Sequence, residues 1–548
     1  MNEQDPPKLV ASDFTSNHQL PPPTNLTTIG KVVHWDASPS FSSVAVLLDA
    51  DREVRPGQLV AVWHGRRKHD LLTVIQVGEC HEVNPNESPE LATARERLGL
   101  GPGYATEGVS TRIFRLAACD TVEELEVEAG ADGSLSLIAS GSPQALSRSG
   151  DPVVLLPDDL AQQTVGGLPD PQKGLAVGSS FGAGGFPVTL RPEVLQMHAG
   201  VFGNPGKGKS YLSGVMIEEA RKWNIPIIAL DVNGEFVETA RALGGLVVTL
   251  PDPTRFGLTL RLITARELIS IAPNVSPTAL YADIIELAHD QLRSEAIKSG
   301  KEVTFDELVA RIETLGESLN ATRVQKAAAV SRILSLAKDP LMQKSGSGFD
   351  FVEAIQKHGI VVLDCRYLSI RQTQLIAAAA ARTLQRKGLE MARTSDADPS
   401  DKEAAEWLSL LFIDEAHAVA PDDDQVVSTQ VLYELARQGR HCRTGLLLSS
   451  QSPADLDRSI LKRLQTRFVF ALEKDQLAAI GGVSADLSQE LQGQLPKLPR
   501  GVCAVSGTSE LIKHGFLLQV RERTTPVGGR TAPVFKSRIK SVGSQELA

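Results

Sequence analysis

The chain has 548 residues, 42% of them hydrophobic and 22% charged, with a formal net charge of −10. This length exceeds what a single hydrophobic core usually supports, so we expect more than one domain. The composition is that of an ordinary globular protein and excludes a largely disordered chain. The acidic balance excludes a surface coated in nucleic acid, although a local basic channel would be compatible with it.

The cysteines and the apolar runs favour a cytoplasmic protein without membrane contact. The N-terminal residues are polar and lack the apolar core of a signal peptide. No run of about 18 apolar residues could cross a bilayer. The five cysteines are scattered singly and form no C-x-x-C pair, which argues against a disulfide framework or a zinc site and favours a reducing compartment.

The first part of the chain is predicted to be a flexible arm followed by a β domain. Residues 1–27 are rich in Pro, Asn and Thr, as expected of a loose segment. Residues 28–165 contain short β-prone runs at regular spacing, which is typical of a small β-barrel. Trp35 and Trp63 lie in these runs and could form a stacking platform for single-stranded nucleic acid, although barrel core is the simpler expectation. The glycine-rich residues 166–186 are predicted to be a linker.

A glycine-rich loop follows. Residues 194–202 before it contain the apolar pieces of a short strand, and the residues after it carry apolar side chains at helical spacing. It fits G-x-x-x-x-G-K-[ST], in which backbone N–H groups and the helix N-terminus bind a polyphosphate. Lys209 is expected against the β- and γ-phosphates and the Ser210 hydroxyl on Mg²⁺, so ATP and Mg²⁺ are the expected cofactors. We expect the nucleotide to be contacted by Gly203, Asn204, Pro205, Gly206, Lys207, Gly208, Lys209, Ser210, Tyr211, Asp231 and Glu235.

Residues 187–521 alternate apolar strands with helical patterns, which predicts an α/β core with a buried parallel sheet. Residues 252–351 break this rhythm and are predicted to be a helical insertion, either a structural lid or a subunit contact. Within it, Thr304 and Glu307 match a capping box at the start of a helix. Residues 522–548 form a basic tail, which either contacts a neighbour or nucleic acid or is simply solvated.

Polar residues stand where successive predicted strands end. The carboxyl ends of parallel strands meet at one edge of a sheet, where ligands bind. There Asp414 could hold Mg²⁺, Glu415 could polarise the attacking water, and Gln451 could contact the γ-phosphate or that water. Asp231 and Glu235 would face the same cleft, unless they only form a tight turn.

Three arginines, Arg437, Arg440 and Arg443, cluster just before the strand that Gln451 closes. They could supply an arginine finger to a neighbouring subunit, contact nucleic-acid phosphates, or lie in a solvated turn. His198 and His417 have no second metal ligand at helical spacing, and both are predicted to be structural.

Five segments, in this order, resemble the HerA branch of the HerA–FtsK ATPases. They are residues 203–210, 231–236 (Asp-Val-Asn-Gly-Glu-Phe), 412–417 (Phe-Ile-Asp-Glu-Ala-His), 436–440 (Ala-Arg-Gln-Gly-Arg) and 449–453 (Ser-Ser-Gln-Ser-Pro). The resemblance covers roughly residues 28–521. It implies a RecA-like P-loop ATPase core behind an N-terminal HAS-barrel, in a hexameric ring that translocates double-stranded DNA. Members typically work with a NurA-type nuclease in DNA end resection and recombinational repair.

By motif position, the resemblance assigns ATPase roles to Lys209, Ser210, Asp414, Glu415 and Gln451, and makes Arg440 the best match to the arginine finger acting in trans. Two features depart from the family pattern. Residues 204–207 (Asn-Pro-Gly-Lys) replace a Thr-Gly-Ser type stretch, and Ser452 replaces a commoner arginine. Neither departure removes a catalytic group, but the first could alter nucleotide affinity.

Three other functions fit parts of the pattern. One is the ATPase ring of an antiphage complex with a nuclease or a sirtuin-like effector. Another is a conjugation, type IV secretion or FtsK-like DNA pump, which the barrel and the lack of a membrane segment disfavour. The third is a small-molecule kinase, which would need neither the barrel nor the helical insertion.

Overall fold

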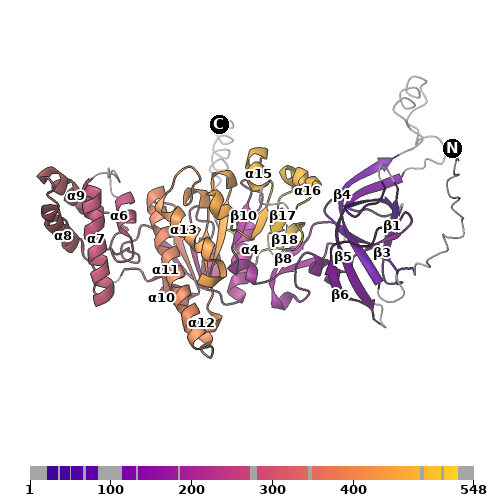
Figure 1. The fold of residues 1–548 in the computed structure, drawn as a ribbon, viewed down its shortest axis with the longest axis horizontal. Coiled ribbons are helices and arrows are strands. Elements are labelled where there is room, and N and C mark those ends of the chain that lie inside the picture. Colours follow the sequence, from indigo (N-terminus) through magenta and orange to yellow (C-terminus); the bar gives the residue numbers. More distant parts are fainter. Residues whose placement is uncertain are drawn as a thin grey trace, which may run out of the picture. The chain divides into compact units, whose positions relative to one another are not determined.

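The computed structural model describes residues 21–34, 38–49, 51–65, 70–83, 114–130, 134–182, 185–271, 280–343, 348–481, 487–507 and 511–528. These residues divide into two compact units (Figure 1). The first comprises the chain up to Val165 with residues 180–187 and 488–491, and the second comprises residues 166–179, 188–487 and those from 492 onward.

Antiparallel strands build the first unit. They are β1 (Thr28–Val33), β2 (Ser43–Leu48), β3 (Leu59–His64), β4 (Asp70–Val83), β5 (Phe114–Ala129), β6 (Leu135–Gly141) and β7 (Pro152–Leu155). Their order is β2-β1-β7-β3-β4-β5-β6, and an additional β2–β5 pairing closes the first six of these into a barrel. The predicted small barrel is therefore confirmed for the described residues.

The barrel core explains the position of one tryptophan. Side chains alternate between buried and exposed along β2, as expected of a strand with one face on a core. Trp63 in β3 is 1% exposed, so it belongs to the core and offers no stacking surface; Trp35 lies outside the described residues. β4 and β5 are 14 and 16 residues long, longer than the short strands predicted, and register shifts in their pairing bend them around the barrel.

The second unit is built on a large mixed sheet. Its strands are β8 (Leu175–Ser180), β9 (Pro187–Leu190), β10 (Ala199–Phe202), β11 (Ile227–Asp231), β12 (Leu246–Thr249), β13 (Ile360–Asp364), β14 (Ser409–Ile413), β15 (Thr444–Ser450), β16 (Thr466–Val469), β17 (Val502–Gly507) and β18 (Phe516–Val520). The order is β12-β13-β11-β14-β15-β10-β16-β17-β18-β8-β9. The run from β12 to β16 is parallel, whereas β16, β17 and β18 pair antiparallel. Because β11, β13 and β14 are buried along their whole length, their apolar runs carry no alternation.

Helices pack against this sheet, among them α4 (Lys209–Lys222), α10 (Phe351–His358), α11 (Ile370–Ala397) and α13 (Val427–Gln438). α11 and α13 lie side by side (Figure 1), and α11 buries a run of five alanines, residues 377–381. The shorter helices are α2 (Asp158–Thr164), α3 (Glu193–Gln196), α5 (Val237–Ala242), α12 (Lys402–Glu406), α14 (Arg458–Leu461), α15 (Lys474–Gly481) and α16 (Gln489–Gln494). None of the helices in the described ranges combines the length and apolar character needed to cross a bilayer.

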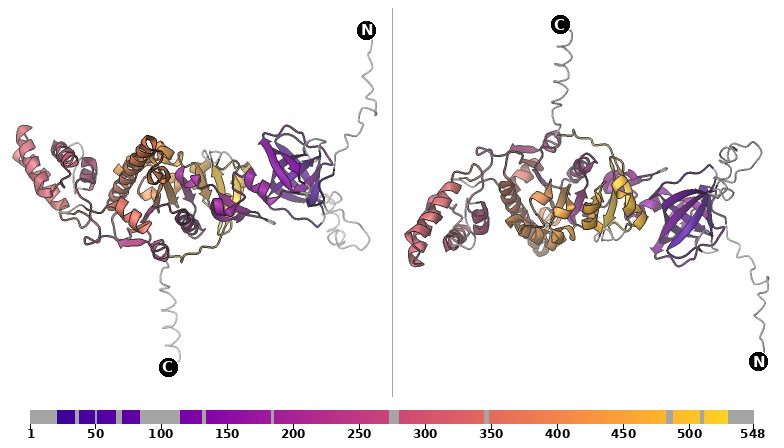
Figure 2. Two further views of the ribbon diagram at one scale, coloured as in Figure 1. Left: turned by 90° about the horizontal axis from the view of Figure 1, so that it is seen from below. Right: turned by 90° about the horizontal axis from the view of Figure 1, so that it is seen from above.

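The predicted helical insertion lies between β12 and β13. It contains α6 (Ala265–Ile271), α7 (Leu280–Ser299), α8 (Phe305–Ser318) and α9 (Arg323–Leu336), which stand beyond α11 and off the sheet in all three views (Figures 1 and 2). Thr304 and Glu307 cap α8 reciprocally, and Thr322 and Gln325 do the same for α9. The capping box predicted at Thr304 is thus confirmed.

The short strand predicted within residues 194–202 is confirmed as β10, at residues 199–202. α3 occupies residues 193–196, and His198 turns the chain with a φ of 64° before β10 begins. One local prediction was wrong. Residues 175–180, predicted as linker, form β8 beside β18 in the sheet. Leu175 and Val177 alternate with more exposed neighbours, a period-two pattern that the surrounding glycines obscured.

Candidate functional site

The glycine-rich loop joins β10 to α4, as the motif requires. Gly206 and Gly208 have φ values of 76° and 127°, a region that other residues rarely adopt. A side chain at Gly208 would also come within 2.9 Å of the Phe470 ring, whereas one at Gly206 would meet nothing within 4 Å. The Gly501 N–H donates to the Lys207 carbonyl at 2.8 Å. The contacts at Lys207 and Gly208 therefore fix the loop against the sheet, whereas no atom packs against the position of a side chain at Gly206.

The acids that end β14 lie against the lysine that ends the loop. Asp414 is fully buried, and Glu415, 9% exposed, has left-handed backbone angles of φ 48° and ψ 52°. Lys209 Nζ is 3.2 Å from Glu415 Oε1. The backbone N–H of Gln451, at the end of β15, donates to Glu415 Oε2 at 3.4 Å. The structure thus brings together four predicted residues from three separate segments.

The turn after β11 joins the same cluster. Asp231 accepts hydrogen bonds from the N–H groups of Glu235, at 3.0 Å, and Phe236, at 2.8 Å. Asn233 Nδ2 donates to Asp414 Oδ2 at 3.1 Å and lies 3.5 Å from Glu415 Oε1. The two readings of this segment are therefore compatible: it is a tight turn, and the turn presents an amide to the acids. The sequence reading missed the contribution of Asn233.

The electrostatics of the cluster favour a bound cation. Burial raises the pKa of Asp414 to about 7, repulsion from Glu415, Asp231 and Glu235 adds to this rise, and Lys209 opposes it. Asp414 Oδ1 is buried and has no hydrogen-bond partner, so Mg²⁺ on Asp414 and Ser210 would satisfy an orphaned acceptor. Among the described residues no three His, Cys, Asp or Glu side chains form a metal cluster, which suits Mg²⁺ because that ion keeps several waters and phosphate oxygens.

The three arginines of the predicted cluster differ in their contacts. Arg443 has a φ of 45°, and its guanidinium donates to the backbone carbonyls of Ala404 and Ala405, so it is structural. Arg437 and Arg440 are exposed. Arg440 precedes β15, whose seven residues separate it from Gln451 by roughly 23 Å at about 3.3 Å per residue. Arg440 therefore lies at the opposite edge of the sheet from the acids of its own subunit.

The two histidines are also distinct. His198 is buried, its Nδ1 accepts from the Leu446 N–H at 3.0 Å, and burial lowers its pKa to about 4. This fits the structural role predicted for it. His417 Nδ1 lies 3.0 Å from Ser450 Oγ and 3.5 Å from Glu415 Oε2. The proximity of His417 to Glu415 could have been predicted, because the two residues lie two positions apart after the same strand.

The segment that follows β18 packs against α4. No sequence pattern near it predicted this contact. The Arg523 N–H donates to the Tyr211 hydroxyl at 2.8 Å, and its guanidinium donates to Thr239 Oγ1 at 2.6 Å. Glu218 of α4 accepts from the N–H groups of Thr524 and Thr525. We call residues 521–528 the C-terminal strap. It fixes the helix that carries Lys209 and Ser210.

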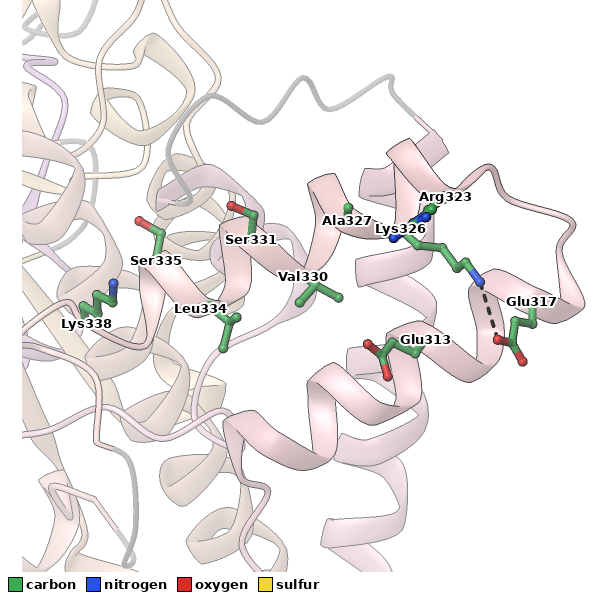
Figure 3. A pocket seen from close by; sticks show the side chains of 10 residues that line it. All are labelled: Glu313, Glu317, Arg323, Lys326, Ala327, Val330, Ser331, Leu334, Ser335 and Lys338. Atoms are coloured by element: carbon green, nitrogen blue, oxygen red, sulfur yellow. Dashed lines mark hydrogen bonds and ion pairs between the residues drawn. The ribbon is translucent and has the colours of Figure 1, made fainter.

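A groove separate from these residues lies between α8 and α9 of the insertion (Figure 3). Its volume is about 880 Å³, and Lys326 on one wall lies 3.5 Å from Glu317 on the other. Val330 and Leu334 contribute apolar side chains to it. The groove shares no residue with the loop or the acids and is not part of the candidate site.

Comparison with known proteins agrees with this geometry. Residues 175–384 match the family model of the central domain of the helicase HerA. The chain is 24% identical over 371 residues to the DNA double-strand break repair helicase HerA of Sulfolobus acidocaldarius, covering 66% of this chain and 71% of that protein. It is 22% identical over 384 residues to a probable helicase of Methanocaldococcus jannaschii, covering 69% and 71%.

Among solved structures, VirB4 of Thermoanaerobacter pseudethanolicus aligns with 67% of this chain and 99% of its own, at 15% identity and a TM-score of 0.49. The family match spans β8 to α11 and so contains the glycine loop, α4 and the Asp231 turn. Both helicase relatives extend over about two thirds of the chain. The chain is therefore similar to the central domain of HerA over residues 175–384, the region that carries its P-loop.

Proposed function

We propose that this chain forms a ring that hydrolyses ATP to move double-stranded DNA. The observation that carries the proposal is the separation of two halves of one active site. Lys209, Asp414 and Glu415 converge at one edge of the sheet, whereas Arg440 is exposed at the other. An arginine that is to neutralise transition-state charge must then come from a neighbouring subunit, and a closed ring gives every subunit such a neighbour.

The residues of the cluster divide the chemistry. Lys209 and the loop N–H groups bind the phosphates, and Ser210 and Asp414 would hold Mg²⁺, which would supply charge neutralisation. Binding of the phosphates to Lys209 competes with its ion pair to Glu415, and this frees the Glu415 carboxylate to polarise the attacking water. Gln451, whose backbone already contacts Glu415, orients that water or the γ-phosphate.

The names of the relatives favour a role in DNA end processing. Several are DNA double-strand break repair helicases. We therefore propose that the ring is hexameric, acts in the cytoplasm, and works with a NurA-type nuclease in end resection and recombinational repair. Mixing the ring with such a nuclease should make degradation of duplex ends dependent on ATP. Unchanged degradation without ATP would reject this partnership while leaving the motor itself untouched.

A complementation experiment tests the ring. Arg440→Ala should lower ATP turnover at least about a hundredfold, because an arginine finger contributes 10³–10⁵ in rate. Lys209→Ala should be inactive because it lacks the lysine that binds the phosphates. Mixed assemblies of the two variants should regain activity, because a boundary with the intact loop of one and the intact arginine of the other is complete. Arg437→Ala, an equally exposed arginine three residues earlier, is the matched control.

Two results would overturn the proposal. If mixing restores no activity although mixed assemblies form, Arg440 does not act across a boundary. If the protein stays monomeric with ATP and duplex DNA and its ATP turnover does not respond to the duplex, it is not a ring-forming DNA motor.

A further inference from the structure

The loop between β13 and α11, together with the first turn of α11, exposes large apolar side chains beside the candidate site. Tyr367 is 69% exposed and Ile370 62% exposed. Arg366 and Arg371 flank them, and both are exposed. β13 pairs in parallel with β11, with Asp364 opposite Asp231, so this loop leaves the sheet at the same edge as the acids. Tyr367 and Ile370 are thus held out beside the Arg371 guanidinium, which suggests a surface for an anionic partner, whereas the charge of Arg366 is paired with Asp364.

The loop is bound directly to the turn that touches Asp414. The Cys365 N–H donates to the Asp231 carbonyl at 2.9 Å. Arg366 donates to both carboxylate oxygens of buried Asp364, at 2.9 and 2.7 Å, which fixes the guanidinium in one orientation. A side chain at Gly234 would come within 2.4 Å of Arg366 Nε, so the turn and the arginine are in close contact.

These contacts form an unbroken path from the acids to the exposed ring. Asn233, next to Gly234, donates to Asp414 Oδ2 at 3.1 Å. At the other end, the Arg366 guanidinium lies 5.6 Å from the centre of the Tyr367 ring, within cation–π range. Asn233 and Tyr367 are therefore linked through Gly234 and Arg366.

We propose that residues 366–371, the contact loop, bind the sugar–phosphate backbone of the DNA and take their position from the nucleotide through Asn233, Gly234 and Arg366. The proposal rests on the DNA motor proposed above and names its contact. The Tyr367 hydroxyl and Arg371 donate to phosphate oxygens, and Ile370 packs against the sugar. Such contacts carry no sequence information, which suits a motor that must move along any DNA.

Tyr367→Ala tests the contact. We expect the Kd for a duplex to rise about tenfold, the usual effect of losing a hydrogen bond to a charged group, and stimulation of ATP turnover by the duplex to fall in step. Turnover without DNA should stay within about twofold of the parent, and the number of subunits in the assembly should not change. Tyr367→Phe separates the hydroxyl from the ring, and Ile297→Ala, a 57% exposed aliphatic on α7, is the matched control.

The outcomes distinguish a DNA contact from a contact with a neighbouring subunit. They also distinguish failure of the DNA contact from failure of the proposed DNA motor. Loss of DNA-independent turnover or of assembly in Tyr367→Ala would show that the loop contacts a neighbouring subunit, and the proposal would be wrong. Unchanged DNA affinity and stimulation would also overturn it. If the parent protein itself neither binds duplex nor responds to it, the failure belongs to the motor and not to the loop.

Arg366→Lys tests the link to the nucleotide, because lysine keeps the charge but loses the fork that grips Asp364. In the parent we expect duplex affinity to differ between a non-hydrolysable ATP analogue and ADP. In Arg366→Lys this ratio should approach one, with duplex still bound in both states. A ratio equal to that of the parent would disprove the path through Arg366.

Discussion

The two edges of the parallel sheet use their polar groups differently. At the carboxyl edge, acids from separate strands converge, and Asp414 Oδ1 is buried without a partner. At the amino edge, the Thr444 hydroxyl is satisfied: Thr444 Oγ1 contacts Ser409 Oγ at 3.0 Å and donates to the Leu384 carbonyl at 3.3 Å. An unsatisfied buried polar atom costs about 1–3 kcal/mol. Asp414 therefore gives up stability for ligand binding, whereas Thr444 contributes to stability.

The largest effect should come from changing the carboxyl edge. Glu415→Gln removes the proposed base, so kcat for ATP hydrolysis should fall by about 10²–10⁴. Nucleotide affinity should persist, because Lys209 and the loop remain. Stability should change by less than about 1 kcal/mol, because the amide still accepts from Lys209 and one of two adjacent negative charges is gone. Phosphate release, binding of a fluorescent nucleotide and chemical denaturation measure the three quantities.

The control for this change is Asp423→Asn, which alters an exposed acid and should leave turnover intact. Normal turnover in Glu415→Gln would remove that residue from its role. A large loss of stability would show instead that the carboxyl edge is built for folding as much as the amino edge is.

The amino edge should give the reverse result. Thr444→Val keeps the shape of a fully buried side chain but deletes its hydroxyl, so unfolding free energy should fall by about 1–2 kcal/mol. Turnover at a temperature where the variant is folded should match the parent. Thr394→Val, at an exposed position of α11, should change stability by less than about 0.5 kcal/mol. If Thr444→Val kept the unfolding free energy of the parent but lowered ATP turnover, the distinction between the two edges would be wrong.

The smallest effect should come from outside the sheet. Thr304→Ala removes the capping box of α8 and should destabilise that helix by about 1 kcal/mol. Amide hydrogen exchange of residues 305–318 would detect the faster opening, and Thr304→Ser should restore protection. ATP turnover should not respond. A change in turnover would show that the insertion communicates with the site.

The parts that could be predicted have local causes. The glycine-rich loop and Lys209 belong to one short sequence motif. Asp414 and Glu415 follow an apolar strand whose parallel pairing with β11 and β15 places them near the other strand ends. Barrel core was the simpler expectation for Trp63, and its burial confirms it. The glycine-rich surroundings of β8 concealed its alternation.

Other contacts could not be predicted, because they join distant positions. Asn233 and Asp414 are 181 residues apart, and Tyr211 and Arg523 are 312 residues apart. Neither Asn233 in a turn nor Arg523 after a strand carries a pattern that names its partner. Only the folded sheet brings them together.

The C-terminal strap has a practical consequence for protein engineering. The Gly528 N–H donates to the Glu235 carbonyl at 3.2 Å, so the strap reaches the turn that contains Asn233. A truncation before Arg521 would at once strip partners from Tyr211, Glu218 and Glu219. Shortened versions of the protein for kinetic work should therefore retain residues up to 528, because without them the helix that holds Lys209 loses these partners.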